Sequence, residues 1–132
     1  MFELSAANSV TDYIENNNQF LIDSTLSEYL NRLCADKGLV KADVIRKAEM
    51  NDIYAYQIFS GVRMPSRDKL VCLCIGMGLN VFETNQLLKY AGFAALYPKN
   101  KRDSVILFGL ERGQGICDIN QALFDVGART LG

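Results

Sequence analysis

LVKADVIRKAEMNDIYAYQIFSGVRMPS, from Leu39 to Ser66, has the pattern of two short helices joined by a tight turn. The first expected helix covers about residues 41–48, where Val44 and Ala48 share one face at i, i+4. The second runs from about Asn51 to Ser60, with Asn51 as its N-cap and Gly61 suited to end it in a left-handed conformation. The stretch therefore predicts a helix-turn-helix unit.

The second of these helices has an unusual outer face. Its inner face is formed by Ala55, Ile58 and Phe59, which leaves Ile53, Tyr54, Tyr56, Gln57 and Ser60 facing outward. A solvated helix of this length normally carries Lys and Glu there. Glutamine can bond bidentately to adenine in the major groove, and apolar groups contact the thymine methyl. The face therefore indicates a surface that meets a partner, and DNA is one candidate.

The order of residues resembles the lambda-repressor-like, XRE-type helix-turn-helix family over about residues 25–91. The matching positions are Leu39, Val44, Ala48, Met50, Ala55, Ile58, Gly61 and Pro65. The chain departs from the family at Ile45, where alanine is usual, and at Glu49, where glycine is usual. We expect Ile45 to splay the two helices slightly, and Glu49 to adopt a positive φ at a cost of ~1 kcal/mol.

The resemblance implies an all-α fold built on a five-helix lambda-repressor-like DNA-binding domain. Thr25 and Glu28 form a capping box that opens the first helix of this domain, Ser66 caps the fourth, and Asn80 with Glu83 caps the fifth. We expect one compact domain over residues 1–132. It consists of an N-terminal extension (1–23), the helix-turn-helix core (24–96) and a C-terminal helix pair (97–132). Residues 2–15 are expected to form a short acidic helix, for which core packing, a subunit contact and fraying remain open.

The C-terminal helix pair repeats residues 66–96. A shift of 35 residues lays Arg67-Asp68 on Arg102-Asp103, and Asn85-Gln86 on Asn120-Gln121. It also lays an apolar stripe of Val81, Thr84, Leu88 and Ala91 on Ile116, Ile119, Leu123 and Val126. Such a period is typical of helix pairs that bury one face on a neighbour. We expect two more helices within residues 101–131, the first opened by Asp103 and Ser104, stacked on the core and offering a homodimer contact.

Charge and cysteine content narrow the class of protein. The net charge is −1, but residues 1–31 carry −5 whereas residues 32–69, around the helix-turn-helix, carry +3. Phosphate attraction requires positive charge at that place. The chain has four cysteines and no histidine, so we expect buried thiols, no metal site and no cofactor. The longest apolar run has ten residues, too short to cross a bilayer, and no export segment opens the chain, so a cytoplasmic location is expected.

These features predict a sequence-specific DNA-binding transcriptional regulator that binds a palindromic operator in double-stranded DNA as a homodimer. The resemblance implies that five residues face bases: Asp52, Ile53, Tyr54, Tyr56 and Gln57. The residues expected at phosphates are Lys41, Ala42, Arg63, Ser66 and Arg67. Asp52 can accept from cytosine or simply cap its helix.

The alternative function is a helical protein–protein interaction module, antitoxin-like or regulator-binding, that does not bind DNA. A protein partner could also bind through the C-terminal helix pair. An enzyme is not expected, because the chain lacks histidine, a glycine-rich phosphate loop and a nucleophile with an evident base.

Overall fold

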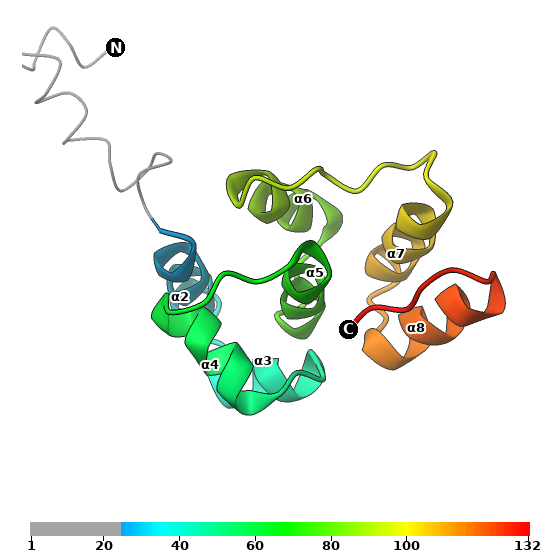
Figure 1. Ribbon diagram of the computed structural model, residues 1–132. Helices are drawn as coiled ribbons and strands as arrows, with labels where there is room; N and C mark the ends of the chain where they lie inside the picture. Colours follow the sequence, from blue (N-terminus) through cyan, green and yellow to red (C-terminus); the bar gives the residue numbers. More distant parts are fainter. Residues whose placement is uncertain (1–24) are drawn as a thin grey trace, which may run out of the picture.

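The computed structural model describes residues 25–132, so the helix expected at residues 2–15 lies outside the described residues. The described part contains seven helices and no strand, which confirms the all-helical class for this part of the chain. In chain order the helices are α2 (Leu26–Asp36), α3 (Lys41–Lys47), α4 (Asp52–Ser60), α5 (Arg67–Gly76), α6 (Val81–Tyr90), α7 (Lys101–Glu111) and α8 (Ile116–Asp125) (Figure 1).

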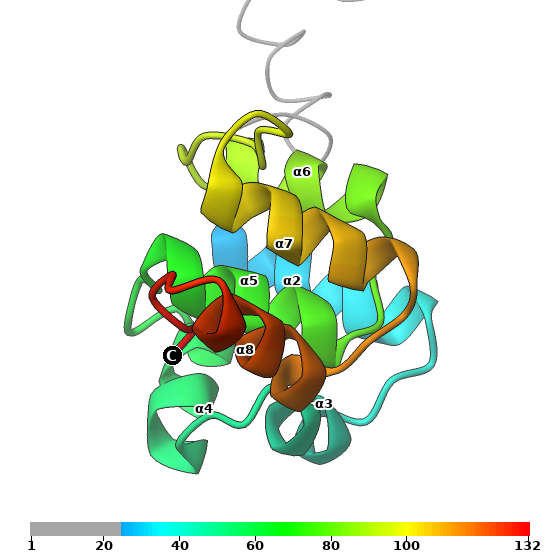
Figure 2. The ribbon, with the colours of Figure 1, turned by 90° about the vertical axis from the view of Figure 1, so that its right-hand side faces the viewer.

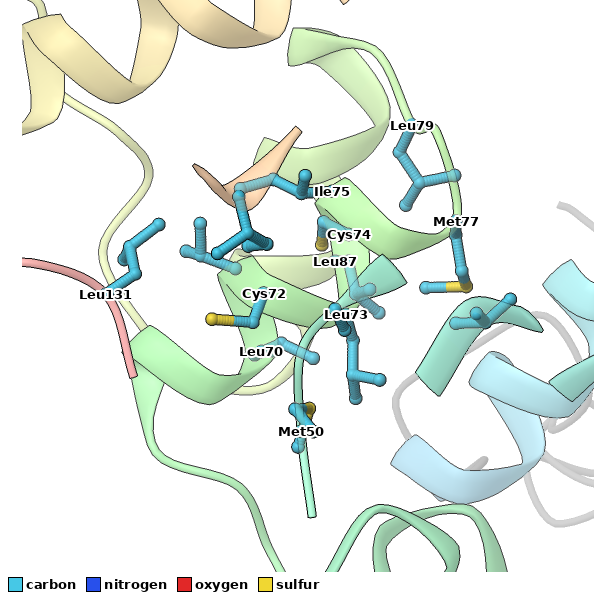
Figure 3. Close-up of a cluster of buried hydrophobic side chains, with 14 of the residues drawn as sticks. Met50, Leu70, Cys72, Leu73, Cys74, Ile75, Met77, Leu79, Leu87 and Leu131 are labelled. Atoms are coloured by element: carbon cyan, nitrogen blue, oxygen red, sulfur yellow. The ribbon is translucent and has the colours of Figure 1, made fainter. Parts of the chain in front are cut away.

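Helix α5 lies at the centre of the fold (Figure 1). Every residue from Leu70 to Gly76 is buried, so beyond its first turn this helix has no solvent face. It packs against α3, α6 and α8. Figure 3 shows Met50 from the turn after α3, Leu87 from α6 and Leu131 from the C-terminal tail around it. The core is therefore built around α5, and the helix pair α3–α4 is attached to it.

Gly76 allows α3 and α5 to approach closely. A Cβ atom at this position would lie 2.5 Å from the carbonyl oxygen of Val44 and 3.0 Å from the Cβ of Ala48. Such distances leave no room for any side chain. Gly76 is the last residue of α5, and Gly78, two residues later, has a left-handed conformation with a φ of 71°. Ile45 of α3 is fully buried in the same core.

Side-chain caps define the ends of most helices. The capping boxes of Thr25 with Glu28 and of Asn80 with Glu83 are both present, as the sequence predicted. Helix α7 differs from the prediction. It begins at Lys101 and is capped by Asn100, whose Oδ1 accepts a hydrogen bond from the Asp103 amide at 2.9 Å. Because Asn100 is the N-cap, Asp103 lies inside α7 and its carboxylate does not serve as the cap of this helix.

The α5–α6 pair and the α7–α8 pair make the same contacts at positions 35 residues apart. Asn85 Oδ1 accepts from the Leu96 amide at 2.8 Å, and Asn120 Oδ1 accepts from the Leu131 amide at 2.7 Å. Each bond ties the segment that follows a helix pair back to the second helix of that pair. The sequence similarity between the two segments therefore corresponds to similar local structure.

Two ion pairs join the α5–α6 pair to the α7–α8 pair. Arg67 of α5 donates to both carboxylate oxygens of Asp103 in α7, at 3.2 and 3.0 Å. Arg102 of α7 donates to both oxygens of Asp68 in α5, at 2.9 Å each. We call these two contacts the exchanged ion pairs. Each arginine lies beside the aspartate of the other helix, so the two pairs fix the orientation of α7 relative to α5.

Because the pKa of Asp68 is lowered, the contribution of its ion pair to folding stability depends on pH. Burial raises this pKa, but the hydrogen bonds and charge of Arg102, with the charges of Arg129 and Arg67, lower it by more, so the net shift is downward. A carboxyl group with a lowered folded-state pKa adds stability above its unfolded pKa of about 4. That contribution disappears as the pH falls through the folded-state value.

Helix α8 is an integral part of the core. Its side chains Ile116, Ile119 and Leu123 are buried where α8 packs on α5 and α7 (Figure 2). The fourth residue of the predicted stripe, Val126, is 39% exposed, so this part of the prediction was wrong. The reason is local, because α8 ends at Asp125 and Val126 lies at its C-cap.

Candidate functional site

Helices α3 and α4 lie together at one end of the molecule, away from α6 and α7 (Figures 1 and 2). Helix α4 packs on α2 through Ala55, Ile58 and Phe59, which are all buried as the sequence predicted. The Asn31 side chain of α2 donates to the Phe59 carbonyl at 2.9 Å. These contacts hold the inner face of α4 and leave its opposite face available to a partner.

The turn between α3 and α4 has the strained residue that the sequence predicted. Glu49 has a φ of 54°, and it is the single non-glycine residue with positive φ among residues 25–132. The next residue, Met50, is buried in the core. Asn51 then caps α4, with its Oδ1 accepting from the Tyr54 amide at 3.1 Å. The turn is thus anchored on both sides of Glu49, which stabilises a conformation that costs ~1 kcal/mol.

The outer face of α4 has one open part and one covered part. Ile53 is 71% exposed and Tyr56 is 46% exposed, and Asp52 is exposed beside them. Tyr54 is half-buried, contrary to the expectation that it faces outward freely. Its ring is covered by the guanidinium of Arg63 at 5.1 Å from the ring centre and by Lys69 Nζ at 5.6 Å.

Gln57 lies at the covered part of this face. Its Oε1 accepts a hydrogen bond from Arg63 Nε at 2.8 Å. Gln57 and Tyr54 therefore share Arg63 as a neighbour. The predicted base-facing residues thus fall into two groups: Asp52, Ile53 and Tyr56 on the open part, and Tyr54 with Gln57 under Arg63.

The residues predicted at phosphates are spread around this face. Lys41 is half-buried at the start of α3, with its Nζ 5.4 Å from the centre of the Phe59 ring, and Ala42 next to it is exposed. Arg63 is exposed in the segment between α4 and α5. Ser66 caps α5, its hydroxyl accepting from the Lys69 amide at 3.2 Å. These four residues are accessible to a ligand that approaches α4.

Arg67 does not belong with them. Besides Asp103, its guanidinium binds the carbonyl oxygens of Ala94 at 3.1 Å and Ala95 at 3.3 Å. The Arg67 side chain is thus engaged on the core side of α5, and its contact with phosphate stays a prediction. The sequence contained a signal for this, because the dipeptide Arg-Asp recurs 35 residues later and each copy can pair with the other.

The structure adds two basic residues that the sequence analysis did not assign to the site. Lys69 lies over the Tyr54 ring, and Arg46 lines a shallow hollow of about 460 Å³ between α3 and α4, together with Glu49, Asp52 and Tyr56. Arg46 also pairs with Asp43, three residues earlier, at 2.9 Å. The sequence shows that Lys69 follows the cap residue Ser66 by three positions. It does not show that the Lys69 side chain lies over Tyr54, because this contact depends on the path of the chain after α4.

The cysteine thiols lie apart from this surface. Cys34, Cys72 and Cys74 are buried as expected, and burial raises the pKa of Cys72 to about 11 and that of Cys74 to about 12. Cys117 is exposed, so the expectation of a buried thiol was wrong there. Within residues 25–132 no group of three metal-ligating side chains is suited to hold a metal ion.

None of the described helices is both long and apolar enough to cross a bilayer. Comparison of the chain with known protein families, with curated proteins and with solved structures found no match.

Proposed function

We propose that the chain is a sequence-specific DNA-binding transcriptional regulator of the lambda-repressor-like, XRE type, with α4 as the recognition helix. In this proposal α2 to α6 form the five-helix domain, and α7 with α8 is the appended pair. The observation that carries the proposal is the outer face of α4, where Ile53, Tyr56 and Gln57 are flanked by Arg63 and Lys69.

The chemistry of this face suits duplex DNA. The major groove is wide enough for one helix, and base edges there offer hydrogen-bonding groups and thymine methyl groups. Amide and apolar side chains such as Gln57 and Ile53 can contact those edges. Cations at the margin, such as Lys41 and Arg63, can contact phosphates, which position the protein without reading sequence.

The proposal extends to a homodimer on a palindromic operator. A two-fold axis would place two copies of α4 about one DNA turn apart. Because the apolar stripe of α8 is buried within its own chain, a dimer contact through the C-terminal helix pair would use exposed residues such as Phe124, which is 72% exposed. Sedimentation of wild type and Phe124→Asp tests this, and equal mass for both proteins would exclude Phe124 from the dimer contact.

The central experiment is a selection of duplexes from a random library with the purified full chain. We expect Gln57→Ala to weaken binding to the selected duplex by ~1–3 kcal/mol and to relax the choice at one base pair. Lys41→Ala should weaken binding to all duplexes alike and lower the salt slope by about one. The matched control is Gln86→Ala, which removes an exposed glutamine from α6, and it should change neither property. A wild-type chain that selects no sequence would contradict the proposal.

One observation favours the second candidate, a helical protein-binding module. Val62 is 77% exposed and Met64 is 64% exposed, directly after α4, so with Ile53 they add apolar surface near the recognition helix. Apolar surface of this kind suits a protein partner. Salt dependence separates the two functions, because affinity for DNA falls steeply with salt whereas affinity for an apolar protein surface changes little.

A further inference from the structure

The path of the chain after α4 places Arg63 beside Gln57. Gly61 has a φ of 85°, a left-handed conformation that reverses the chain direction. The amides of Val62 and Arg63 then both return to the Gln57 carbonyl oxygen, at 2.9 and 3.2 Å. The backbone of Arg63 is therefore anchored on the same residue that its side chain contacts.

The contact between the two side chains fixes the orientation of the Gln57 amide. A guanidinium group has only donors, so the glutamine atom that it binds must be the acceptor, Oε1. The amide nitrogen Nε2 then points away from Arg63 and carries two free donors. In this arrangement Arg63 occupies one of the two lone pairs of Oε1 and lies on the acceptor side of the amide. A bidentate bond to adenine needs one donor and one acceptor, so it is less accessible to Gln57 than donation from Nε2.

Arg63 also contacts the ring of Tyr54. The guanidinium lies 5.1 Å from the centre of the Tyr54 ring, within the range of a cation–π interaction. Three contacts thus hold Arg63: its backbone bond to the Gln57 carbonyl, its side-chain bond to Gln57 Oε1 and its contact with Tyr54. Lys69 contacts the same ring at 5.6 Å, but the structure gives it no bond to Gln57.

We propose that Arg63 sets the base specificity of Gln57 by turning the two Nε2 donors of its amide toward the base, and that this arrangement selects guanine. Guanine is the base whose major-groove edge offers two acceptors, N7 and O6, whereas adenine offers one acceptor and one donor. This inference rests on the proposed DNA-binding function. In it Arg63 is a positioning residue for Gln57, in addition to any phosphate contact that it makes.

The test compares four full-length proteins in the same random-duplex selection: wild type, Gln57→Ala, Arg63→Ala and Lys69→Ala. Loss of preference in Gln57→Ala identifies the base pair that Gln57 contacts. At that pair we expect wild type to prefer guanine over adenine by at least about 5-fold, the lower limit for one good bidentate contact. In Arg63→Ala the amide is free to turn, so the preference should fall below about 2-fold or change to adenine. Lys69→Ala removes a cation from the same tyrosine ring and should weaken binding without changing the preferred base.

The outcomes separate this inference from the function on which it rests. Wild-type selection of guanine that disappears in Arg63→Ala but persists in Lys69→Ala supports the inference. A clear preference that is the same in wild type and Arg63→Ala overturns it and leaves the DNA-binding function standing. A wild-type preference for adenine at the pair that Gln57 contacts also overturns it. If wild type selects no sequence, both the inference and the proposed function fail.

Discussion

The exchanged ion pair between Arg67 and Asp103 predicts a large energetic coupling between residues that are far apart in the sequence. Only 25% of the arginine side chain and 9% of the aspartate side chain are exposed, so solvent screens the pair weakly. Removing one partner of a fully buried pair costs about 3–5 kcal/mol, whereas an exposed pair contributes about 0–1 kcal/mol. Because this arginine is partly exposed, we expect Arg67→Ala to destabilise the protein by about 2–4 kcal/mol.

A double-mutant cycle measures the coupling itself. We expect about 1–3 kcal/mol of coupling between Arg67→Ala and Asp103→Ala, since two charge-assisted hydrogen bonds join these side chains. Unfolding by urea at pH 7 and constant salt gives the four free energies. The exposed pair Arg46–Asp43 is the matched control, because its N–O distance is similar, 2.9 Å, but its side chains are 68% and 53% exposed. Its coupling should stay below about 0.5 kcal/mol.

Two results would refute this reasoning. Coupling between Arg67 and Asp103 below about 0.5 kcal/mol, the usual limit of additivity, would mean that the pair contributes no more than independent side chains. A second test uses DNA. If Arg67 is committed to Asp103, then Arg67→Ala should leave the salt slope of DNA binding unchanged in variants that remain folded. A slope lower by about one would return Arg67 to the phosphate contacts.

Four further predictions follow from packing, burial and charge. The variant Asp68→Asn should lose less stability than wild type as the pH falls below about 4, because it removes a carboxyl group whose folded-state pKa is lowered. If the free energy of unfolding in urea falls equally for both proteins below this pH, the prediction is wrong. Gly76→Ala should destabilise by about 1–3 kcal/mol through overpacking against α3. Gly115→Ala, where a Cβ has open space, should cost less in the same assay, at most about 1 kcal/mol from the loss of glycine at the N-cap of α8. In the folded protein a thiol reagent should modify Cys117 rapidly and the three buried cysteines slowly, and fast reaction of all four thiols in peptide mapping would refute the assigned burial. Truncation after Asn100 should lower the melting temperature, because it uncovers α5 and removes the buried residues of α8; an unchanged melting temperature would show that α7 and α8 are accessory.

Most helix ends could be predicted from the sequence because caps are local interactions, although the start of α7 was placed at Asp103 instead of Lys101. Asn51 caps α4 through an amide three residues away, and Gly61 ends it by its own backbone conformation. Both ends of α4 depend on residues within one helical turn, so the order of side chains along the chain is enough to predict them. The positive φ of Glu49, by contrast, was predicted from the resemblance to the helix-turn-helix family, in which glycine is usual at this position, and not from the order of side chains alone.

The sequence predicted the elements of the candidate site better than their surroundings. The inner face of α4 follows from helical periodicity, and its residues are buried as expected. The bond between Gln57 and Arg63 was not predicted, because it joins residues six positions apart across a change in chain direction. Periodicity shows which side chains share a helix face, but it does not show which later side chain folds back over them.

Only the tertiary structure determines the contacts between distant segments. The longest apolar run of the sequence includes the central part of α5, and α3, α6 and α8 bury every side of it. Arg67 at the start of a helix looks the same in the sequence whether it binds phosphate or protein, and its partner Asp103 lies 36 residues away. The sequence by itself thus determined the helices and their ends, because those depend on neighbouring residues. The packing of the C-terminal helix pair determined which faces and charges remain exposed, because burial depends on the whole chain.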